Sequence, residues 1–389
     1  MKSHYKPLGR YIREVKVKNV DLQAKELLGI NIDKFFMPSV ANVVGTDLSN
    51  YKIVKRNQFA CNRMHVGRDY RIPVALSHKD EPFMVSPAYD VFEIKDTSVL
   101  MPEYLMMWFS RKEFDRNAWF HTDADVRGGL PWKAFCEMQL PVPSIEKQRE
   151  IVAEYNTVQN RIVLNSQLIQ KLEATAQALY KHWFVDFEFP DENGNPYKSS
   201  GGEMVESELG EIPKEWVLGT LENIYQFQYG LGNTNPDNNG PYPVYGSNGI
   251  IGGFDKYNNE DAPVIGHIGA NCGSVVFAFG KHFVTYNGVM CLIKDKSEKW
   301  FGYNTLLIKD LMSQTRGSSQ PFVSYDMLYE LQVVLPTKRI SYKYNEICAK
   351  IYSNINISLR EVVKLEGFKD LLLSKIATIE TAKPELATV

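Results

Sequence analysis

The chain has 389 residues, enough for two or three domains that each bury a core of their own. Its hydrophobic content of 44% and aromatic content of 12% are those of a globular protein, and because it has neither a long apolar span nor a leader after Met1, we expect a soluble, cytoplasmic protein. A net charge of −2 argues against a protein that coats nucleic acid over its whole surface, and five scattered cysteines without a C-x-x-C pair argue against a disulfide framework or a zinc site.

Residues 1–143 predict a first globular segment of mixed α/β structure. Short runs rich in aromatic and β-branched residues, broken by Gly, Pro, Asn and Asp, are typical of strands, and residues 103–114 (EYLMMWFSRKEF) are typical of one short helix. A basic stretch within this segment contains a single acidic residue, Asp69; its cations are Lys52, Lys55, Arg56, Arg63, Arg68 and Arg71. Charge alone is compatible with either a solvated face or a nucleic-acid contact.

Residues 144–185 predict a long amphipathic helix. The stretch lacks Gly and Pro, and its apolar residues recur in steps of three and four, which places them on one stripe. The polar Asn165 interrupts the stripe where an apolar residue is due. The residues of the stripe are Ile151, Tyr155, Val158, Ile162, Ile169, Leu172, Ala176 and Leu179.

After this helix the chain repeats the same parts in the same order. A linker over 186–208 is dense in Pro, Gly, Asn and Ser, and it is followed by a second globular segment over 209–336. A second long helix is predicted over 337–377, and 378–389 form a C-terminal tail. We therefore predict two globular domains, each followed by a long helix.

The two helical stretches superpose at an offset of 193 residues, from Lys171 to Lys364. Even the interruption recurs, because Ser358 falls opposite Asn165. The stripe of the second helix comprises Ile351, Ile355, Ser358, Val362, Leu365 and Leu372. Each half also has an Arg-Gly loop before its last strand, at 127–131 and at 316–321. These matches indicate an internal duplication.

A helix of this length spans roughly 50–57 Å at 1.5 Å per residue, which is long for one small domain. Its narrow stripe favours a partner helix, so we expect the two helices to form an antiparallel coiled-coil spacer in which Asn165 and Ser358 help to set the register. The alternative is that each helix packs only on its own domain. Two similar domains on such a spacer would form a pseudo-twofold reader of two DNA half-sites, spaced about 34–36 Å or a multiple of that distance.

Catalytic motifs are absent from the sequence. There is no phosphate loop, dinucleotide-binding turn, H-E-x-x-H, G-x-S-x-G or N-P-P-aromatic motif, and the glycine-rich 246–253 lacks a strand-turn-helix frame. His121, Asp123 and Asp125 have the composition of a metal site but also of a solvated loop. The run 90–95 has the acidic pair and lysine of a nuclease but also the alternation of a strand. We expect no catalytic residue, cofactor or metal in this chain.

Side chains suited to reading DNA are present in both halves. Arg and Lys can bind guanine, Asn and Gln can bind adenine, and glycines allow the backbone to approach a groove. For each one alone, an ordinary turn is the simpler interpretation. The candidates are Lys52, Lys55, Arg56, Asn62, Arg63, His65, Arg68 and Arg127 in the first half, and Tyr245, Ser247, Asn248, His267, Asn271, Asn287, Arg316 and Ser318 in the second.

Over nearly its full length the chain resembles the specificity subunits of type I restriction-modification systems. The resemblance rests on Tyr51–Val54, Asn62–Asp69, Leu140–Pro143, His182–Phe187 and Ser207–Trp216. The second helix departs from the family pattern, because Tyr342, Tyr344 and Lys369 dilute its stripe.

The resemblance implies a non-catalytic subunit with two target-recognition domains, 1–143 and 209–336, and two spacer helices. Such a subunit reads a bipartite, asymmetric site in double-stranded DNA and binds two copies of an adenine methyltransferase subunit. Restriction-translocase subunits join that core, and S-adenosylmethionine, ATP and magnesium are used by the partners. The alternatives are a nuclease or methyltransferase with an unfamiliar site and a helical adaptor that assembles partners without touching DNA.

Overall fold

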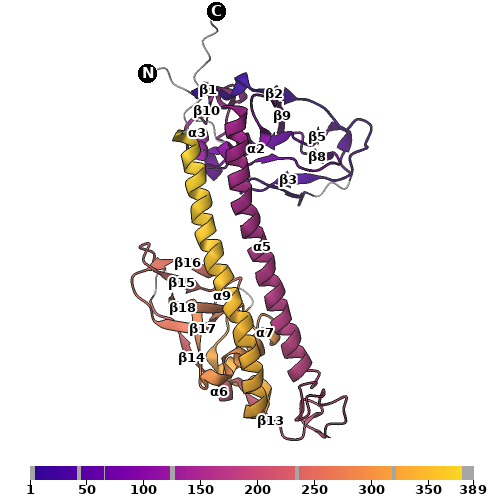
Figure 1. Ribbon diagram of the computed structural model, residues 1–389, viewed down its shortest axis with the longest axis vertical. Helices are drawn as coiled ribbons and strands as arrows, with labels where there is room; N and C mark the ends of the chain where they lie inside the picture. The colour runs from indigo at the N-terminus through magenta and orange to yellow at the C-terminus, as the bar shows by residue number, and fades with distance from the viewer. Residues whose placement is uncertain are drawn as a thin grey trace, which may run out of the picture. The chain divides into compact units, whose positions relative to one another are not determined.

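The computed structural model describes residues 5–41, 45–64, 66–122, 128–232, 236–317 and 321–378 (Figure 1). It divides into two compact units, each with a mixed α/β fold. Unit 1 comprises Met1–Leu164 and Val362–Val389, and unit 2 comprises Asn165–Glu361. The long helices α5 (Ile145–Phe184) and α9 (Lys338–Lys375) contribute residues to both units. The sequence analysis places these helices at 144–185 and 337–377.

Unit 1 is built on an antiparallel sheet with the strand order β2-β9-β6-β7. Phe59 pairs with Phe92 across the central strands, and their rings stack at 5.0 Å. Three strand pairs accompany this sheet: β1-β10, β3-β4 and β5-β8. The strands are β1 (Tyr5–Pro7), β2 (Ile12–Val15), β3 (Leu28–Ile30), β4 (Phe36–Pro38), β5 (Lys52–Val54), β6 (Phe59–Cys61), β7 (Val74–Leu76), β8 (Phe83–Val85), β9 (Asp90–Ile94) and β10 (Gln139–Pro141).

Short helices cover the core of unit 1. The predicted single helix at 103–114 is wrong in detail, because the segment forms two helices: α2 ends at Phe109 and extended backbone at Arg111 precedes α3. The core gathers around the buried aromatic rings of Phe59, Phe92 and Phe135. The helices are η1 (Leu8–Arg10), η2 (Leu48–Asn50), α1 (Val66–Asp69), α2 (Pro102–Phe109), α3 (Lys112–Phe120), α4 (Trp132–Glu137) and η4 (Ile376–Thr378).

Unit 2 contains a larger sheet with the strand order β14-β19-β17-β18-β15-β16. Its pairs are antiparallel except for β15 with β18, and β13 pairs with β20 and β11 with β12 outside this sheet. The strands are β11 (Met204–Val205), β12 (Ile212–Pro213), β13 (Val217–Thr220), β14 (Tyr225–Tyr229), β15 (Tyr242–Gly246), β16 (Gly249–Phe254), β17 (Asn259–Gly266), β18 (Val275–Val284), β19 (Gly288–Ile293) and β20 (Gln332–Leu335). The short helices are α6 (Leu221–Ile224), η3 (Lys296–Glu298), α7 (Lys299–Ile308) and α8 (Tyr325–Tyr329).

The two units share an order of elements along the chain and within their sheets. The order β2-β9-β6-β7 in unit 1 is matched by β14-β19-β17-β18 in unit 2. In each unit the first strand, β1 or β13, pairs antiparallel with the strand that precedes the long helix, β10 or β20. A short helix, α4 or α8, lies just before that last strand. The sheet of unit 2 has two further strands, β15 and β16, whereas unit 1 has the separate pairs β3-β4 and β5-β8.

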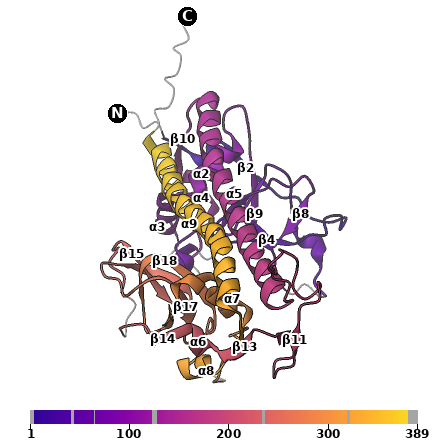
Figure 2. The ribbon, with the colours of Figure 1, turned by 60° about the horizontal axis from the view of Figure 1, so that its bottom comes forward.

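Within unit 1, the first part of α5 packs against the last part of α9 (Figures 1 and 2). Val158, Ile162 and Leu372 form a buried cluster, with Val362 and Leu365 packed against it. The hydroxyl of Tyr5 donates to the carbonyl of Ala377 at 2.7 Å, which ties β1 to the residues after α9. Low-numbered residues of α5 thus meet high-numbered residues of α9.

Within unit 2, the last part of α5 packs against the first part of α9. Here the expectation for Tyr344 is wrong. The sequence pattern treats it as an interruption of the stripe, yet Tyr344 is 0% exposed and its hydroxyl donates to the carbonyl of Ala176 at 3.1 Å. Its ring contacts those of Tyr180 and Phe184, because the apolar body of a tyrosine packs like a phenylalanine once its hydroxyl has a partner.

The two polar residues of the stripe are buried in unit 2, Asn165 at 4% exposure and Ser358 at 5%. The Nδ2 of Asn165 has no hydrogen-bond partner within the part of the chain that the structure describes. A buried amide without a partner costs free energy, so this position opposes the stability of the helix pair.

Candidate nucleic-acid interface

In unit 1 the predicted DNA-binding residue Arg63 is held by partners from its own unit. It follows β6, and its Nε donates to Asp90 Oδ2 at 2.6 Å. Its Nη1 donates to the carbonyl of Leu130, and its guanidinium lies 5.5 Å from the ring centre of Trp132, at the start of α4. The side chain is 18% exposed, and that of Asp90 is 15% exposed. Arg63 therefore joins two strands of the sheet to the segment before α4.

The same place joins two backbones at a pair of glycines. Gly67 N donates to the carbonyl of Gly128 at 2.8 Å, and Leu130 N donates to the carbonyl of Arg63 at 2.9 Å. A Cβ added at Gly67 would lie 2.7 Å from Cα of Gly128, which is closer than side-chain carbons come to backbone. Gly128 has a positive φ of 57°, a backbone conformation that favours glycine. Both glycines are therefore required by the close approach.

The other predicted cations of unit 1 differ in how far they reach solvent. Arg68 is 68% exposed and forms an ion pair with its neighbour Asp69 at 2.7 Å. Arg56 is exposed and pairs with Asp80. Lys52 is partly buried, with its amine on the carbonyl of Tyr89 at 2.5 Å. Exposed ion pairs are weak, so Arg68 and Arg56 can exchange a carboxylate for a phosphate at little cost.

Two further predicted DNA-binding residues of unit 1, Lys55 and Asn62, are hydrogen-bonded to residues close to them in the chain. Lys55 is exposed, and its backbone N donates to Oε1 of Gln58 at 2.9 Å. Asn62 is half-buried, and its Oδ1 accepts from the backbone N of Met64 at 3.1 Å. The predicted residues His65, Arg127 and Ser318 lie outside the described residues, as do Asp123 and Asp125.

In unit 2 His267 occupies a position like that of Arg63. It follows β17, its Nδ1 lies 2.7 Å from the carbonyl of Val323, and Val323 N donates to the carbonyl of His267 at 3.0 Å. Its ring lies 4.4 Å from that of Tyr229, which in turn lies 4.5 Å from that of Tyr325, at the start of α8. A backbone carbonyl on Nδ1 requires a hydrogen on that nitrogen.

Polar residues gather beside His267. Nδ2 of Asn271 donates to Oδ1 of Asn248 at 2.8 Å, and both residues are exposed. The neighbouring Ser247 is half-buried, and its carbonyl accepts from Oγ of Ser274 at 3.1 Å. The carbonyl of Asn287 accepts from His267 N at 2.8 Å. The structure thus brings five predicted residues of this half to one place: Ser247, Asn248, His267, Asn271 and Asn287.

Tyr245 lies in the core of unit 2. It is 8% exposed, packs with Val264 and Val284, and has its ring 5.3 Å from that of His282. Burial raises the pKa of its hydroxyl. This aromatic residue of a Gly-rich run is a core residue because β15 is paired on both sides, with β16 and β18, and periodicity in so short a strand does not indicate that.

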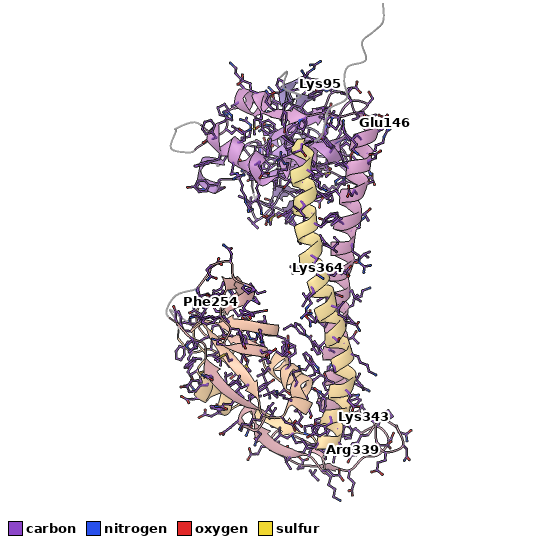
Figure 3. The ribbon with its side chains drawn as sticks, turned by 60° about the vertical axis from the view of Figure 1, so that its left-hand side comes forward. Lys95, Glu146, Phe254, Arg339, Lys343 and Lys364 are labelled. Atoms are coloured by element: carbon purple, nitrogen blue, oxygen red, sulfur yellow. The ribbon has the colours of Figure 1, made fainter. Side chains whose placement is uncertain are left out.

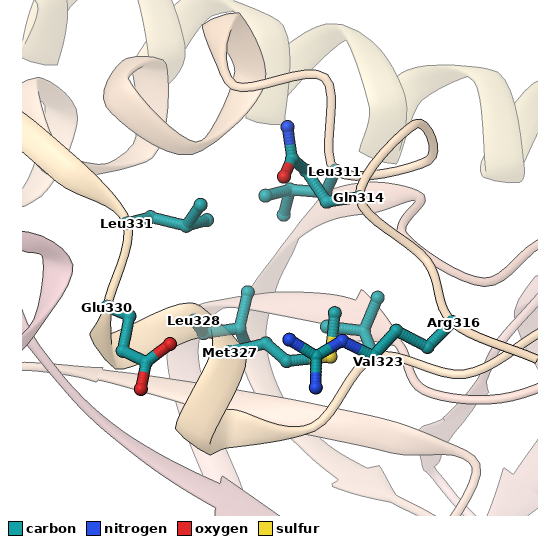
Figure 4. A pocket seen from close by; sticks show the side chains of 8 residues that line it. All are labelled: Leu311, Gln314, Arg316, Val323, Met327, Leu328, Glu330 and Leu331. Atoms are coloured by element: carbon teal, nitrogen blue, oxygen red, sulfur yellow. The ribbon is translucent and has the colours of Figure 1, made fainter.

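Arg316 borders a cavity of ≈ 290 Å³ in unit 2 (Figure 4). Its backbone pairs with that of Phe322 in both directions, at 2.9 and 3.1 Å, which closes the Arg-Gly loop. The side chains of Gln314 and Glu330 also line the cavity, and its apolar lining comes from Leu311, Val323, Met327, Leu328 and Leu331.

The acidic residues of the run 90–95, which resembles a nuclease pattern, form structural contacts. Asp90 binds Arg63, and Glu93 binds Arg13 at 2.6 Å and Gln58 at 2.8 Å. Lys95, labelled in Figure 3, donates to the carbonyls of Gly9 and Arg10. Among the described residues no group of three or more His, Cys, Asp or Glu is placed to hold a metal ion.

Some notable surface residues carry no signal in the sequence. The exposed rings of Tyr70 and Trp119 meet at 5.2 Å, and Phe120 beside them is 80% exposed. Sequence reasoning also missed the pairing of Arg63 with Asp90 and Leu130, because these partners are 27 and 67 residues away along the chain. From the sequence alone, nothing distinguishes Asp90 from the other carboxylates of the chain as the partner of Arg63.

Comparison with known proteins identifies the second unit most directly. Residues 213–362 match a family model described as the type I restriction modification DNA specificity domain. The chain is 22% identical over 321 residues to the type I restriction enzyme MjaIX specificity subunit of Methanocaldococcus jannaschii, covering 74% of this chain and 71% of the relative. It is 26% identical over 160 residues to the HindI specificity subunit of Haemophilus influenzae, covering 40% of this chain and 34% of that one.

The fold is similar to a solved structure over nearly the whole chain. The type I restriction-modification S subunit from M. genitalium superposes with a TM-score of 0.59 at 17% identity, covering 97% of this chain and 96% of that chain. None of the helices in the described ranges is long and apolar enough to cross a membrane. Both curated relatives are named specificity subunits of type I restriction enzymes, in line with the expectation of a specificity subunit. The resemblance drawn from the sequence is confirmed: the chain is a relative of the specificity subunits of type I restriction-modification systems, and residues 213–362 belong to their DNA specificity domain family.

Proposed function

We propose that this chain selects the DNA target of a type I restriction-modification complex, reading a bipartite, asymmetric site with one unit per half-site. The observation that carries the proposal is the repeated strand order, β2-β9-β6-β7 and β14-β19-β17-β18. In both units a loop closes beside the strand that precedes Arg63 or His267. Two copies of one framework with unlike loops suit two unlike half-sites, and we take them to be the products of one duplication.

The DNA-contacting groups we propose are the exposed polar residues beside these two loops. In unit 1 they include Arg68, next to Gly67. We add the exposed cations Arg56 and Lys55, which precede β6 at its other end and can also meet phosphate or guanine. In unit 2 Asn248 and Asn271 present amide groups that suit adenine once their mutual hydrogen bond opens. We also keep Lys52, Asn62, Ser247, Asn287, Arg316, His65, Arg127 and Ser318 as proposed members of the surface. Arg63 and His267 belong to it too, in the different role argued below.

We further propose that α5 and α9 form a coiled-coil spacer between the half-site readers and that their outer faces bind two methyltransferase subunits. Exposed apolar side chains support this role, since a helix in water gains nothing from them. In unit 1 these include Leu164 at 59%, Val363 at 72% and Leu371 at 60%; in unit 2, Leu168 at 45% and Ile357 at 61%. The methyltransferases would supply S-adenosylmethionine chemistry and recruit the ATP- and magnesium-dependent restriction subunits, in the cytoplasm.

The experiment is to express the chain with its methyltransferase subunits and map methylated adenines in the host DNA. We expect a motif of two short, unlike half-sites with a gap of constant length. A continuous palindrome would contradict the proposal.

A second measurement tests the spacer. Inserting one helical turn near Asn165 is expected to lengthen the gap and leave both half-sites unchanged. The chain alone, incubated with DNA, magnesium and a methyl donor, should neither cut nor methylate.

A further inference from the structure

Arg63 directs its Nε and Nη1, and His267 its Nδ1, to partners within their own units. Arg63 directs Nε to Asp90 and Nη1 to the carbonyl of Leu130, and its guanidinium stacks over Trp132. A guanidinium that reads guanine must instead direct two adjacent donors outward to O6 and N7. With a side chain 18% exposed, Arg63 is poorly disposed for that contact.

The residue whose carbonyl each side chain binds lies two positions before a short helix. Leu130 precedes Pro131 and α4, and Val323 precedes Ser324 and α8. In both cases the contact is double: the side chain of Arg63 or His267 binds the carbonyl, while its own carbonyl accepts the N–H of the same residue. A second backbone contact follows, from Gly67 N to Gly128 or from Gly269 N to Pro321 at 3.0 Å.

These two double contacts hold the last residues of each Arg-Gly loop against the residues that follow β6 in unit 1 or β17 in unit 2. We propose that Arg63 and His267 are positioning residues, which clamp the recognition loop of each unit and act on DNA only through that loop. The part of this inference that concerns DNA rests on the function proposed above. The clamp itself is a property of the free chain.

The clamp can be tested on the full chain without DNA, by backbone amide hydrogen exchange. Arg63→Lys keeps the charge but cannot reach Asp90 and the Leu130 carbonyl together. Loss of a charged hydrogen bond should speed exchange at Leu130 and Gly67 roughly ten- to hundredfold. Arg68→Ala, which removes an exposed arginine from the same segment, should leave both amides unchanged. The amide of Leu8, bonded to the carbonyl of Met138 in the same unit, reports whether the fold is intact.

In unit 2 the matched pair is His267→Phe and His267→Asn. Phenylalanine keeps the ring against Tyr229 but loses the donor to Val323, so exchange at the Val323 amide should accelerate. Asparagine can place an N–H where Nδ1 lies and should restore slow exchange. Asn271→Ala is the control, because its side chain contacts Asn248 and not Val323.

DNA binding by the chain with its methyltransferase subunits supplies the second readout, on a duplex that carries the mapped motif. A lost phosphate contact reduces the slope of log affinity against log salt by about one, as expected for Arg68→Ala. Arg63→Lys should weaken specific binding at least tenfold, with the slope unchanged and discrimination reduced at several base pairs of one half-site.

Wild-type exchange at Leu130 and Gly67 in Arg63→Lys would overturn the clamp, and so would a loss of discrimination confined to a single base pair. If the wild-type complex selects no DNA motif, the proposed function fails, and the exchange experiment still decides whether the clamp exists.

Discussion

In unit 1 the start of the long helix is held by an uncharged side chain, whereas in unit 2 it is held by charges. Gln148 of α5 is 0% exposed; its Oε1 accepts from Met101 N and its Nε2 donates to the carbonyls of Val99 and Pro143. In α9, Lys338 pairs with Asp295 and Glu298, and Ser341 donates to Glu298 at 2.6 Å. Ser341 is the residue that the 193-residue offset places opposite Gln148.

At the Arg-Gly loops the difference between the units is reversed, because here it is unit 1 that uses an ion pair. Unit 1 holds its loop with the ion pair of Arg63 and Asp90, and unit 2 holds its loop with a histidine and a backbone carbonyl. The two units therefore agree in which elements are joined and differ in which groups join them. Strand order survives such exchanges because it depends on the apolar faces of the strands, while each polar contact needs only a donor and an acceptor.

The largest expected difference in stability between the two units comes from breaking a buried ion pair in unit 1. Lys34 and Asp115 meet at 2.7 Å with side chains 6% and 12% exposed, and burial lowers the pKa of the Lys34 amine. Asp115→Ala leaves that cation buried without its carboxylate, and it also leaves Ile72 N without its acceptor. We expect a loss of about 3–5 kcal/mol of unfolding free energy, confined to unit 1. Denaturant-dependent hydrogen exchange resolved by unit measures it, and an equal loss in both units would show that they unfold as one.

The next effect compares the two helix starts directly. Gln148→Ala removes the three hydrogen bonds of this buried side chain to backbone groups and should cost about 2–3 kcal/mol in unit 1. Ser341→Ala, at the matching position, removes one bond to Glu298 and should cost about 1 kcal/mol in unit 2. The same hydrogen-exchange measurement gives both values. Equal costs would mean that the helix starts do not differ as their contacts indicate.

Lowering the pH should change the stability of unit 2 more than that of unit 1 at the starts of the long helices. The pKa of Asp295 is lowered from an ordinary value of 3.8 to about 2. The main cause is the hydrogen bond from the hydroxyl of Tyr342, and the second is the hydrogen bond from Lys338. A lowered folded-state pKa adds stability above pH 4 that is lost as pH falls towards 2. Exchange near the start of α9 should therefore accelerate over that window, and Asp295→Asn should be less stable than wild type at neutral pH and equal to it near pH 2. At the start of α5, Gln148 is uncharged, so its hydrogen bonds do not depend on the titration of its own side chain.

The smallest expected effect is at Asn165, whose Nδ2 is buried without a partner in the described ranges. Asn165→Leu removes an unsatisfied group of similar size and should stabilise unit 2 by up to about 1 kcal/mol. Thermal unfolding of the variant against wild type measures the gain. A loss of stability would indicate that the amide makes a contact that the folded chain needs.

The long helices were the most predictable part of the molecule. Their apolar spacing is repeated over many turns, and stripe positions such as Asn165 and Ser358 are buried. The buried Val152, Tyr180 and Tyr352, however, lie off the predicted stripes. Tyr344 was misjudged because a pattern of apolar residues cannot show that a hydroxyl will find the Ala176 carbonyl. The loop clamps were not predictable, since they depend on partners brought near by strand pairing rather than by sequence. Arg63 and His267 were selected for their chemistry, and only the fold reveals where that chemistry is directed.

The contact of Gly67 with Gly128 has a consequence for engineering new specificities. Because a Cβ at either position would collide with the opposite backbone, these two glycines and Arg63 mark the limits of what can be changed in unit 1. A specificity library that keeps Gly67, Gly128 and Arg63 and varies exposed residues such as Arg68 would leave this backbone contact intact.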